Sequence, residues 1–165
     1  MSNAKGLTIT TPGDREIVIR REFNAPRELV FDALGKAELL KRWFNGPPGW
    51  TLALCEVDFR VGGKYRFVWH GPDGAELGLG GVHKEIVRPE RMVRTETFDQ
   101  DWTGGETLGT SVLTETNGST LLTTTVVYAT REARDGALRS GMEYGMEHGY
   151  QLLDAFLAEQ LAAKA

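Results

Sequence analysis

Residues 107–130, TLGTSVLTETNGSTLLTTTVVYAT, decide the fold class of this 165-residue chain. The β-branched residues threonine and valine, which favour strands, fill the runs on both sides of Asn117-Gly118. An Asn-Gly pair between two such runs is the strongest short signal for a β-hairpin turn. The pattern therefore predicts two antiparallel neighbouring strands, at residues 107–116 and 120–129.

The same period of two extends back to Trp50 and predicts four more strands, at residues 50–59, 64–70, 77–88 and 92–98. The breaks between strands carry residues that form turns, namely Gly62-Gly63, Gly71-Pro72-Asp73-Gly74, Pro89-Glu90 and Gly104-Gly105. Strands joined by such short connections pair antiparallel. All six strands are therefore expected in one antiparallel meander.

Helices flank this meander on both sides. Towards the N-terminus, a half-buried strand at residues 15–23 is followed by two short helices at about residues 26–35 and 39–44. Towards the C-terminus, residues 131–164 contain no proline and repeat apolar residues every three to four positions, which predicts one amphipathic helix of about thirty residues. The predicted class is α+β, with seven curved antiparallel strands wrapped round a long C-terminal helix.

The length of the chain predicts one domain. We place that domain at residues 15–163 and expect residues 1–14 to be a flexible N-terminal segment, beginning with the remnant of an expression tag. The start of the chain has no apolar stretch of the kind a secretory signal needs. The longest uncharged run, residues 116–130, is too short and too polar to span a bilayer.

Composition excludes several functions. The 19 Lys and Arg residues are outnumbered by 23 Asp and Glu residues, so the basic surface of a nucleic-acid-binding protein is not expected. The single cysteine, Cys55, excludes an internal disulfide framework and a cysteine-cluster metal site, and we expect it to be a small core residue. A lone unpaired cysteine suits a reducing compartment, which predicts a cytoplasmic protein.

Residues typical of catalysis are scarce. The 3 histidines, His70, His83 and His148, lie on separate predicted elements without metal-binding spacing, and no nucleophile, phosphate-loop or dinucleotide motif is present. Glu56 and Asp58 share one strand face and could act as an acid–base pair, but we favour solvated charges there. We therefore predict no catalytic residue set, no metal and no cofactor.

Two other patterns suggest a binding cavity. Tyr65, Phe67 and Trp69 share one strand face, which is typical of a core but also of an aromatic wall beside an apolar cavity. In the C-terminal helix, glycine recurs every four residues at Gly141, Gly145 and Gly149, at a cost of about 1 kcal/mol each in helix propensity. Either the helix packs very closely on the sheet there, or the missing side chains leave a cavity. Periodicity does not decide between the two.

Several blocks of sequence, in order, resemble one known family. They are APRELVFDAL at 25–34, LKRWF at 40–44, CEVDFRVGGKYRF at 55–67, GPDG at 71–74, PERMV at 89–93 and GMEHGYQLLD at 145–154. These blocks are similar to bacterial domains related to the C-terminal domain of the activator of the Hsp90 ATPase, within the START-like, Bet v 1-like superfamily. The resemblance implies a helix-grip fold with an apolar cavity between sheet and helix. Superfamily members include carriers or sensors of lipophilic molecules, some cyclases and hydrolases, and a stress-related co-chaperone domain.

The leading functional hypothesis is the binding of a hydrophobic or aromatic small molecule in that cavity, as a carrier or sensor. The residues expected to line the cavity or its mouth are Trp43, Phe44, Phe67, Trp69, His83 and Tyr144, with His83 as the polar anchor. One alternative is an enzyme of the cyclase or hydrolase kind that uses His83, Glu56 or Asp58. Another is a protein-interaction module, such as a chaperone partner. Homodimerisation stays open.

Overall fold

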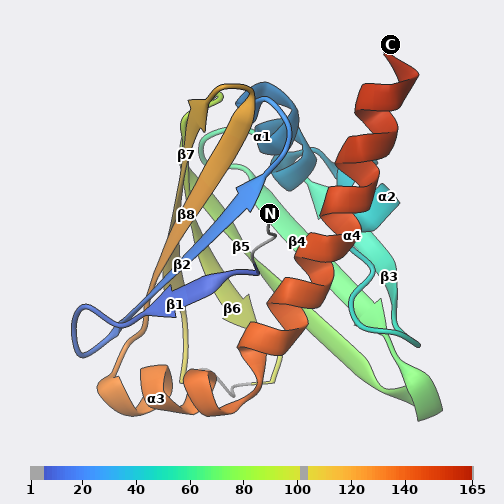
Figure 1. The fold of residues 1–165 in the computed structure, drawn as a ribbon. Helices are drawn as coiled ribbons and strands as arrows, with labels where there is room; N and C mark the ends of the chain where they lie inside the picture. The colour runs from blue at the N-terminus through green and yellow to red at the C-terminus, as the bar shows by residue number, and fades with distance from the viewer. Residues whose placement is uncertain (1–5, 101–103, 165) are drawn as a thin grey trace.

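The computed structural model describes residues 6–100 and 104–164, and its centre is one antiparallel sheet of 8 strands in the order β1-β2-β8-β7-β6-β5-β4-β3 (Figure 1). The strands are β1 (Thr8–Thr10), β2 (Glu16–Phe23), β3 (Thr51–Val57), β4 (Lys64–His70), β5 (Glu76–Val87), β6 (Arg91–Phe98), β7 (Thr107–Thr116) and β8 (Ser119–Val127). The helices are α1 (Arg27–Gly35), α2 (Ala37–Trp43), the short 3-10 turn η1 (Pro72–Gly74), α3 (Arg131–Arg139) and α4 (Met142–Ala163).

The hairpin that decided the fold class forms as predicted. Thr116 pairs with Ser119 across a two-residue turn, in which Asn117 has a φ of 53° and Gly118 a φ of 82°. Two consecutive positive φ angles match the twist of the flanking strands, which is why Asn-Gly is favoured at this place. The order of elements and the strand pairing also confirm the α+β class, the antiparallel sheet and the long C-terminal helix.

The prediction of seven strands is wrong by one. Thr8–Thr10, which the sequence analysis left in the N-terminal segment, forms the edge strand β1 and pairs antiparallel with β2, where Ile9 lies opposite Ile19. A run of three residues is too short to show a clear period of two in the sequence. Its place in the sheet comes from pairing with the neighbouring strand.

The single helix predicted at residues 131–164 is also wrong, because the structure divides it into α3 and α4. Gly141 has a φ of 85°. This angle lies in the left-handed region, which a helix cannot continue through and which glycine adopts without strain. The apolar spacing continues on both sides of this break, so it gave no sign of the change in direction. In Figure 1, α3 closes one end of the molecule, and α4 then crosses one face of the sheet towards α1 and α2 at the other end.

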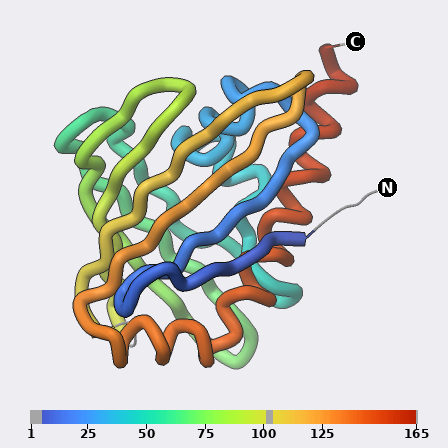
Figure 2. The backbone as a smooth tube through the Cα atoms, turned by 60° about the vertical axis from the view of Figure 1, so that its left-hand side comes forward, coloured from blue at the N-terminus to red at the C-terminus, as the bar shows by residue number. Residues whose placement is uncertain are grey.

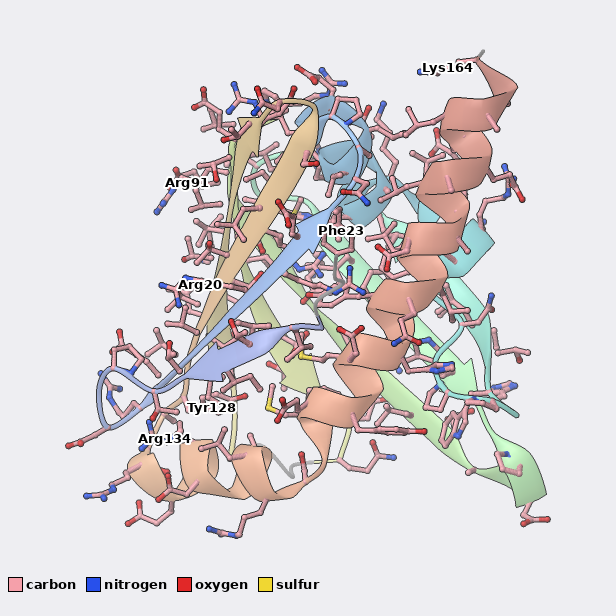
Figure 3. The ribbon with its side chains drawn as sticks, viewed as in Figure 1. Arg20, Phe23, Arg91, Tyr128, Arg134 and Lys164 are labelled. Atoms are coloured by element: carbon pink, nitrogen blue, oxygen red, sulfur yellow. The ribbon has the colours of Figure 1, made fainter. Side chains whose placement is uncertain are left out.

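The main core lies between α4, α1, α2 and the inner face of the curved sheet. Figure 2 shows, in the turned view, α4 running along one face of the sheet. Its most deeply buried large side chains include Phe23, Phe31, Phe67, Leu113, Leu153 and Leu157. Figure 3 shows Phe23 directed towards α4, whereas Arg20 and Arg91 project from the outer face of the sheet. This alternation fits the period of two in the strands.

An ionic cluster around the buried Arg21 joins the sheet to α4. Arg21 of β2 is 6% exposed, and its guanidinium donates to Glu147 at 3.0–3.1 Å and to Asp154 at 2.8–2.9 Å. Burial raises the pKa of Glu147, but hydrogen bonds from Arg21, the backbone N–H of Leu7 and Gln151 outweigh it, so this pKa lies below its ordinary value. The cluster holds α4 at a defined position over the sheet.

Candidate functional site

A cavity of about 520 Å³ lies between the first half of α4 and the inner face of the sheet. Its walls are mostly apolar and come from α1, α2, the loop after α2, strands β2 and β4–β8, and α4. The aromatic residues that line it are Trp43, Phe44, Trp50, Trp69, Phe98, Tyr128 and Tyr150. A largely apolar concavity of this size is typical of a small-molecule site.

The glycines of α4 leave room for this cavity. Gly145 and Gly149 both line it, and a Cβ atom built at either position would meet no heavy atom within 4 Å. Close packing of the helix on the sheet would bring atoms of the sheet into that space. Of the two interpretations left open by the sequence, the structure therefore supports the cavity, while Gly141 serves the turn between α3 and α4.

The aromatic wall is held in place by hydrogen bonds from its polar edges. The indole N–H of Trp43 donates to the carbonyl oxygen of Ala33 at 3.0 Å, and that of Trp69 donates to the carbonyl oxygen of Phe44 at 2.9 Å. The Phe44 ring meets the Trp69 ring edge to face, with centroids 5.0 Å apart. Because the indole N–H groups already have partners, these rings present apolar surface to the cavity.

Phe67 belongs to the same wall but lies behind the surface of the cavity. It is 1% exposed and is not among the lining residues, although its ring contacts Phe44 at 5.4 Å and Trp69 at 5.9 Å between centroids. Of the six predicted residues, Trp43, Phe44 and Trp69 line the cavity directly. Phe67 supports them from the core.

His83, which the sequence suggested as the polar anchor, is not among the residues that line the cavity. It is fully buried beside Phe59 and Tyr65, outside the cavity lining, and its Nδ1 lies 3.2 Å from the carbonyl oxygen of Gly63. Burial lowers its pKa, and the nearby charge of Arg94 lowers it further. His83 is a neutral core residue that bonds the neighbouring turn.

Tyr144 also lies elsewhere than predicted. It is on α4, but its side chain is 75% exposed and it does not line the cavity. The helical turn that carries Gly145 and Gly149 towards the sheet directs Tyr144 to the solvent.

The residues proposed for acid–base chemistry do not meet in the cavity. Glu56 and Asp58 are exposed on the surface, and Asp58 accepts a hydrogen bond from Arg60 at 2.8 Å. Within residues 6–100 and 104–164, no group of three or more His, Cys, Asp or Glu side chains lies where it could hold a metal ion. Cys55 is buried, as expected, and burial raises the pKa of its thiol.

Two charged residues in the cavity were missed by the sequence analysis. Arg94 and Glu96 lie on the inner face of β6 and both line the cavity. The Arg94 guanidinium lies over the ring of Tyr65, at 4.6 Å from its centroid. Burial raises the pKa of Glu96, although Arg94 partly counteracts this.

Tyrosine hydroxyls complete the polar part of the lining. Burial raises the pKa of Tyr128 to about 12, and the neighbouring Glu96 contributes in the same direction. Burial likewise raises the pKa of Tyr150 to about 12. Both hydroxyls are therefore neutral at physiological pH and are available as hydrogen-bond donors.

The alternation along β6 could have pointed to Arg94 and Glu96, but it is ambiguous. One face carries Met92, Arg94, Glu96 and Phe98, and the other carries Val93, Thr95 and Thr97, so each set mixes apolar and polar residues. Such a pattern does not indicate which face is inside.

Comparisons with known proteins assign the chain to a family. The sequence model of the family described as "Activator of Hsp90 ATPase homolog 1-like protein" matches residues 24–158. The chain belongs to this family. No curated protein is similar enough to match it.

Solved structures of bacterial proteins agree. A protein from Rhodobacter sphaeroides is 37% identical, with a TM-score of 0.88 over 94% of this chain and 99% of its own. Protein NE0264 from Nitrosomonas europaea is 24% identical, with a TM-score of 0.80 over 92% of this chain and 99% of its own, and shows the likeness of the fold. As for membranes, no helix in the described ranges has the length and apolar character needed to cross a bilayer.

Proposed function

We propose that the protein binds a hydrophobic or aromatic small molecule in the cavity between the sheet and α4, as a carrier or sensor. The observation that carries this proposal is the cavity of about 520 Å³, whose lining is mostly apolar and aromatic. A cavity of this size lies within the usual range of ligand sites, about 300–1,000 Å³. Trp43, Phe44 and Trp69 form the aromatic wall against which such a molecule packs.

The helix sequence supports the same proposal. Two glycines within α4, Gly145 and Gly149, lower helix propensity by about 2 kcal/mol in total relative to alanine. Within residues 6–100 and 104–164, no atom packs within 4 Å of a Cβ built at either position. A structural role in close packing would explain this cost, but the described residues show no such packing there. Keeping the cavity open accounts for it.

The test is the binding of N-phenyl-1-naphthylamine, an uncharged fluorescent aromatic molecule, followed by energy transfer from the tryptophans that line the cavity. We expect saturable binding to the wild type. Gly149→Leu places a side chain in the cavity and should weaken binding by about tenfold or more, because overfilling a site costs about 1–3 kcal/mol. The variant should still fold, since leucine is a better helix former than glycine.

Gly136→Leu is the matched control. Gly136 lies on α3, where a Cβ atom also meets nothing within 4 Å, but it does not line the cavity. This variant should bind the probe like the wild type. Absence of binding to folded wild type, or equal loss of binding in both variants, would overturn the proposal.

A further inference from the structure

We propose that the ligand is an amphiphilic carboxylic acid, whose carboxylate is bound by Arg94 while its apolar part lies against the aromatic wall. This inference rests on the proposed function and adds the chemistry of the headgroup. The Nη1 atom of Arg94 is buried and has no hydrogen-bond partner among the residues that the structure describes.

A buried nitrogen of a charged guanidinium with an unused N–H donor is costly. Leaving a buried donor unsatisfied costs about 1–3 kcal/mol, and more when the group is charged. In the part of the chain described, Arg94 forms no ion pair, even with Glu96 two residues away on the same strand face. An anion in the cavity would provide the missing acceptor and the missing counter-charge.

The surroundings of Arg94 orient it for this role. Its guanidinium lies 4.6 Å from the centroid of the Tyr65 ring and 5.9 Å from that of Phe67. The two rings therefore hold the guanidinium by cation–π contacts. The residue paired with it on β7 is Gly109, which has no side chain and also lines the cavity. The space beside Arg94 is therefore left free by its neighbour in the sheet.

The groups near Arg94 favour a single negative charge on the ligand. They are Glu96 on β6, Tyr65 on β4, His83 on β5 and Tyr150 on α4, and none of them adds a second cation, because His83 is kept neutral by burial. A phosphate dianion would meet one guanidinium and a nearby carboxyl group. A carboxylate fits one guanidinium through paired N–H donors.

The test compares decanoic acid with decanol, which share the same alkyl chain and differ in the headgroup. Calorimetric titration of the wild type near neutral pH should show tighter binding of decanoate, on the order of tenfold, as expected for a charge-assisted hydrogen bond. Arg94→Gln should remove this preference and leave decanol binding within about twofold. Arg94→Lys, which keeps the charge, should retain part of the preference.

Arg91→Gln is the matched control for the loss of one positive charge. Arg91 lies on the same strand but projects from the outer face, where it pairs with Glu85 (Figure 3). It should behave like the wild type with both ligands. Circular dichroism and thermal unfolding check that each variant is folded, and the wild-type preference by itself tests the proposal if Arg94→Gln does not fold.

The outcomes separate the two proposals. Equal affinity of the wild type for decanoate and decanol, or an unchanged preference in folded Arg94→Gln, would overturn the carboxylate inference and leave the cavity function standing. If the folded wild type binds neither ligand nor the uncharged aromatic probe, both proposals fail.

Discussion

The two halves of α4 face the same sheet but pack against it differently. In the C-terminal half, Leu153, Phe156 and Leu157 are each at most 5% exposed and fill the space between helix and sheet. In the N-terminal half, Gly145 and Gly149 present no side chain, and the cavity occupies the corresponding space. Because side-chain volume changes along α4, one half of the helix fills the core and the other half borders the cavity.

This difference predicts where stability and binding are located. Burial of large apolar side chains is the main favourable contribution to folding, so the filled half should carry most of the stability of the helix–sheet contact. The hollow half should tolerate substitutions that the filled half does not.

Removing a side chain from the filled half should have the largest effect. Leu153 is fully buried. Leu153→Ala should therefore lower the free energy of unfolding by about 3 kcal/mol, measured by urea denaturation. Met146 lines the existing cavity. Because Met146→Ala creates little new void, it should cost less than about 1 kcal/mol. Equal costs would contradict the division of α4 into two halves.

The ionic cluster between the two halves should have the next effect. Glu147→Gln removes the charge that Arg21 bonds. It should lower the free energy of unfolding by about 2 kcal/mol at neutral pH, as for hydrogen bonds to charged groups. The pKa of Glu147 is lowered in the folded state from its ordinary value of 4.5. This stabilisation is therefore present above the ordinary value and is lost as the pH falls through the lower folded pKa.

The difference between wild type and Glu147→Gln, measured by thermal unfolding, should therefore shrink in acid. Glu143→Gln is the control, since Glu143 is exposed on the same helix and should change stability little at any pH. A constant difference between wild type and Glu147→Gln from neutral to acid pH would argue against the cluster as its source.

Adding one methyl group to a glycine should have opposite signs in two places. At Gly145 a new Cβ atom meets nothing. Gly145→Ala should therefore raise the free energy of unfolding by about 1 kcal/mol through helix propensity. At Gly35, on α1, a Cβ atom would collide with the ring of Phe59. Gly35→Ala should therefore lower this free energy by about 1 kcal/mol or more. Chemical denaturation of both variants measures these two free energies of unfolding. A destabilised Gly145→Ala would mean that the space beside Gly145 is not free.

Glu96 lines the cavity, and the charge of Arg94 partly offsets the cost of burying its carboxylate. Burial raises the pKa of Glu96 above its ordinary value of 4.5, so the folded state holds its proton to a higher pH than the unfolded state does. Stability should therefore fall as the pH rises from the unfolded pKa to the folded one. Glu96→Gln should lack this fall, so unfolding curves of the two proteins should differ more at neutral pH than in acid below the unfolded pKa.

Much of the fold could be predicted because it depends on local signals. The Asn117-Gly118 turn and the alternation of residues 107–130 specify a hairpin through backbone preferences that act within a few residues. Lys64–His70 and Thr107–Thr116 form strands with the predicted bounds. The N-terminal strand β1 and the break at Gly141 were not predicted. The short strand β1 depends on pairing with β2, and the break leaves the apolar period unchanged.

The site could be predicted only in part. Trp43, Phe44 and Trp69 line the cavity, since bulky aromatic residues on inner faces point to the space between sheet and helix. Tyr144 was misplaced because helical spacing shows which residues share a face but not how that face is rotated relative to the sheet. Arg94 and Glu96 were missed because charged residues are normally expected outside.

Local patterns in the sequence specify the elements, their antiparallel order and the positions without side chains on the last helix. Whether two of those positions, Gly145 and Gly149, meet the sheet or border a cavity follows from the folded structure alone. Periodicity specifies which residues share a face, whereas the distance between two faces depends on the curvature of the whole sheet and on the place where Arg21 holds α4. That distance leaves Arg94 in the lining of an apolar cavity, where its buried Nη1 has no acceptor among the described residues.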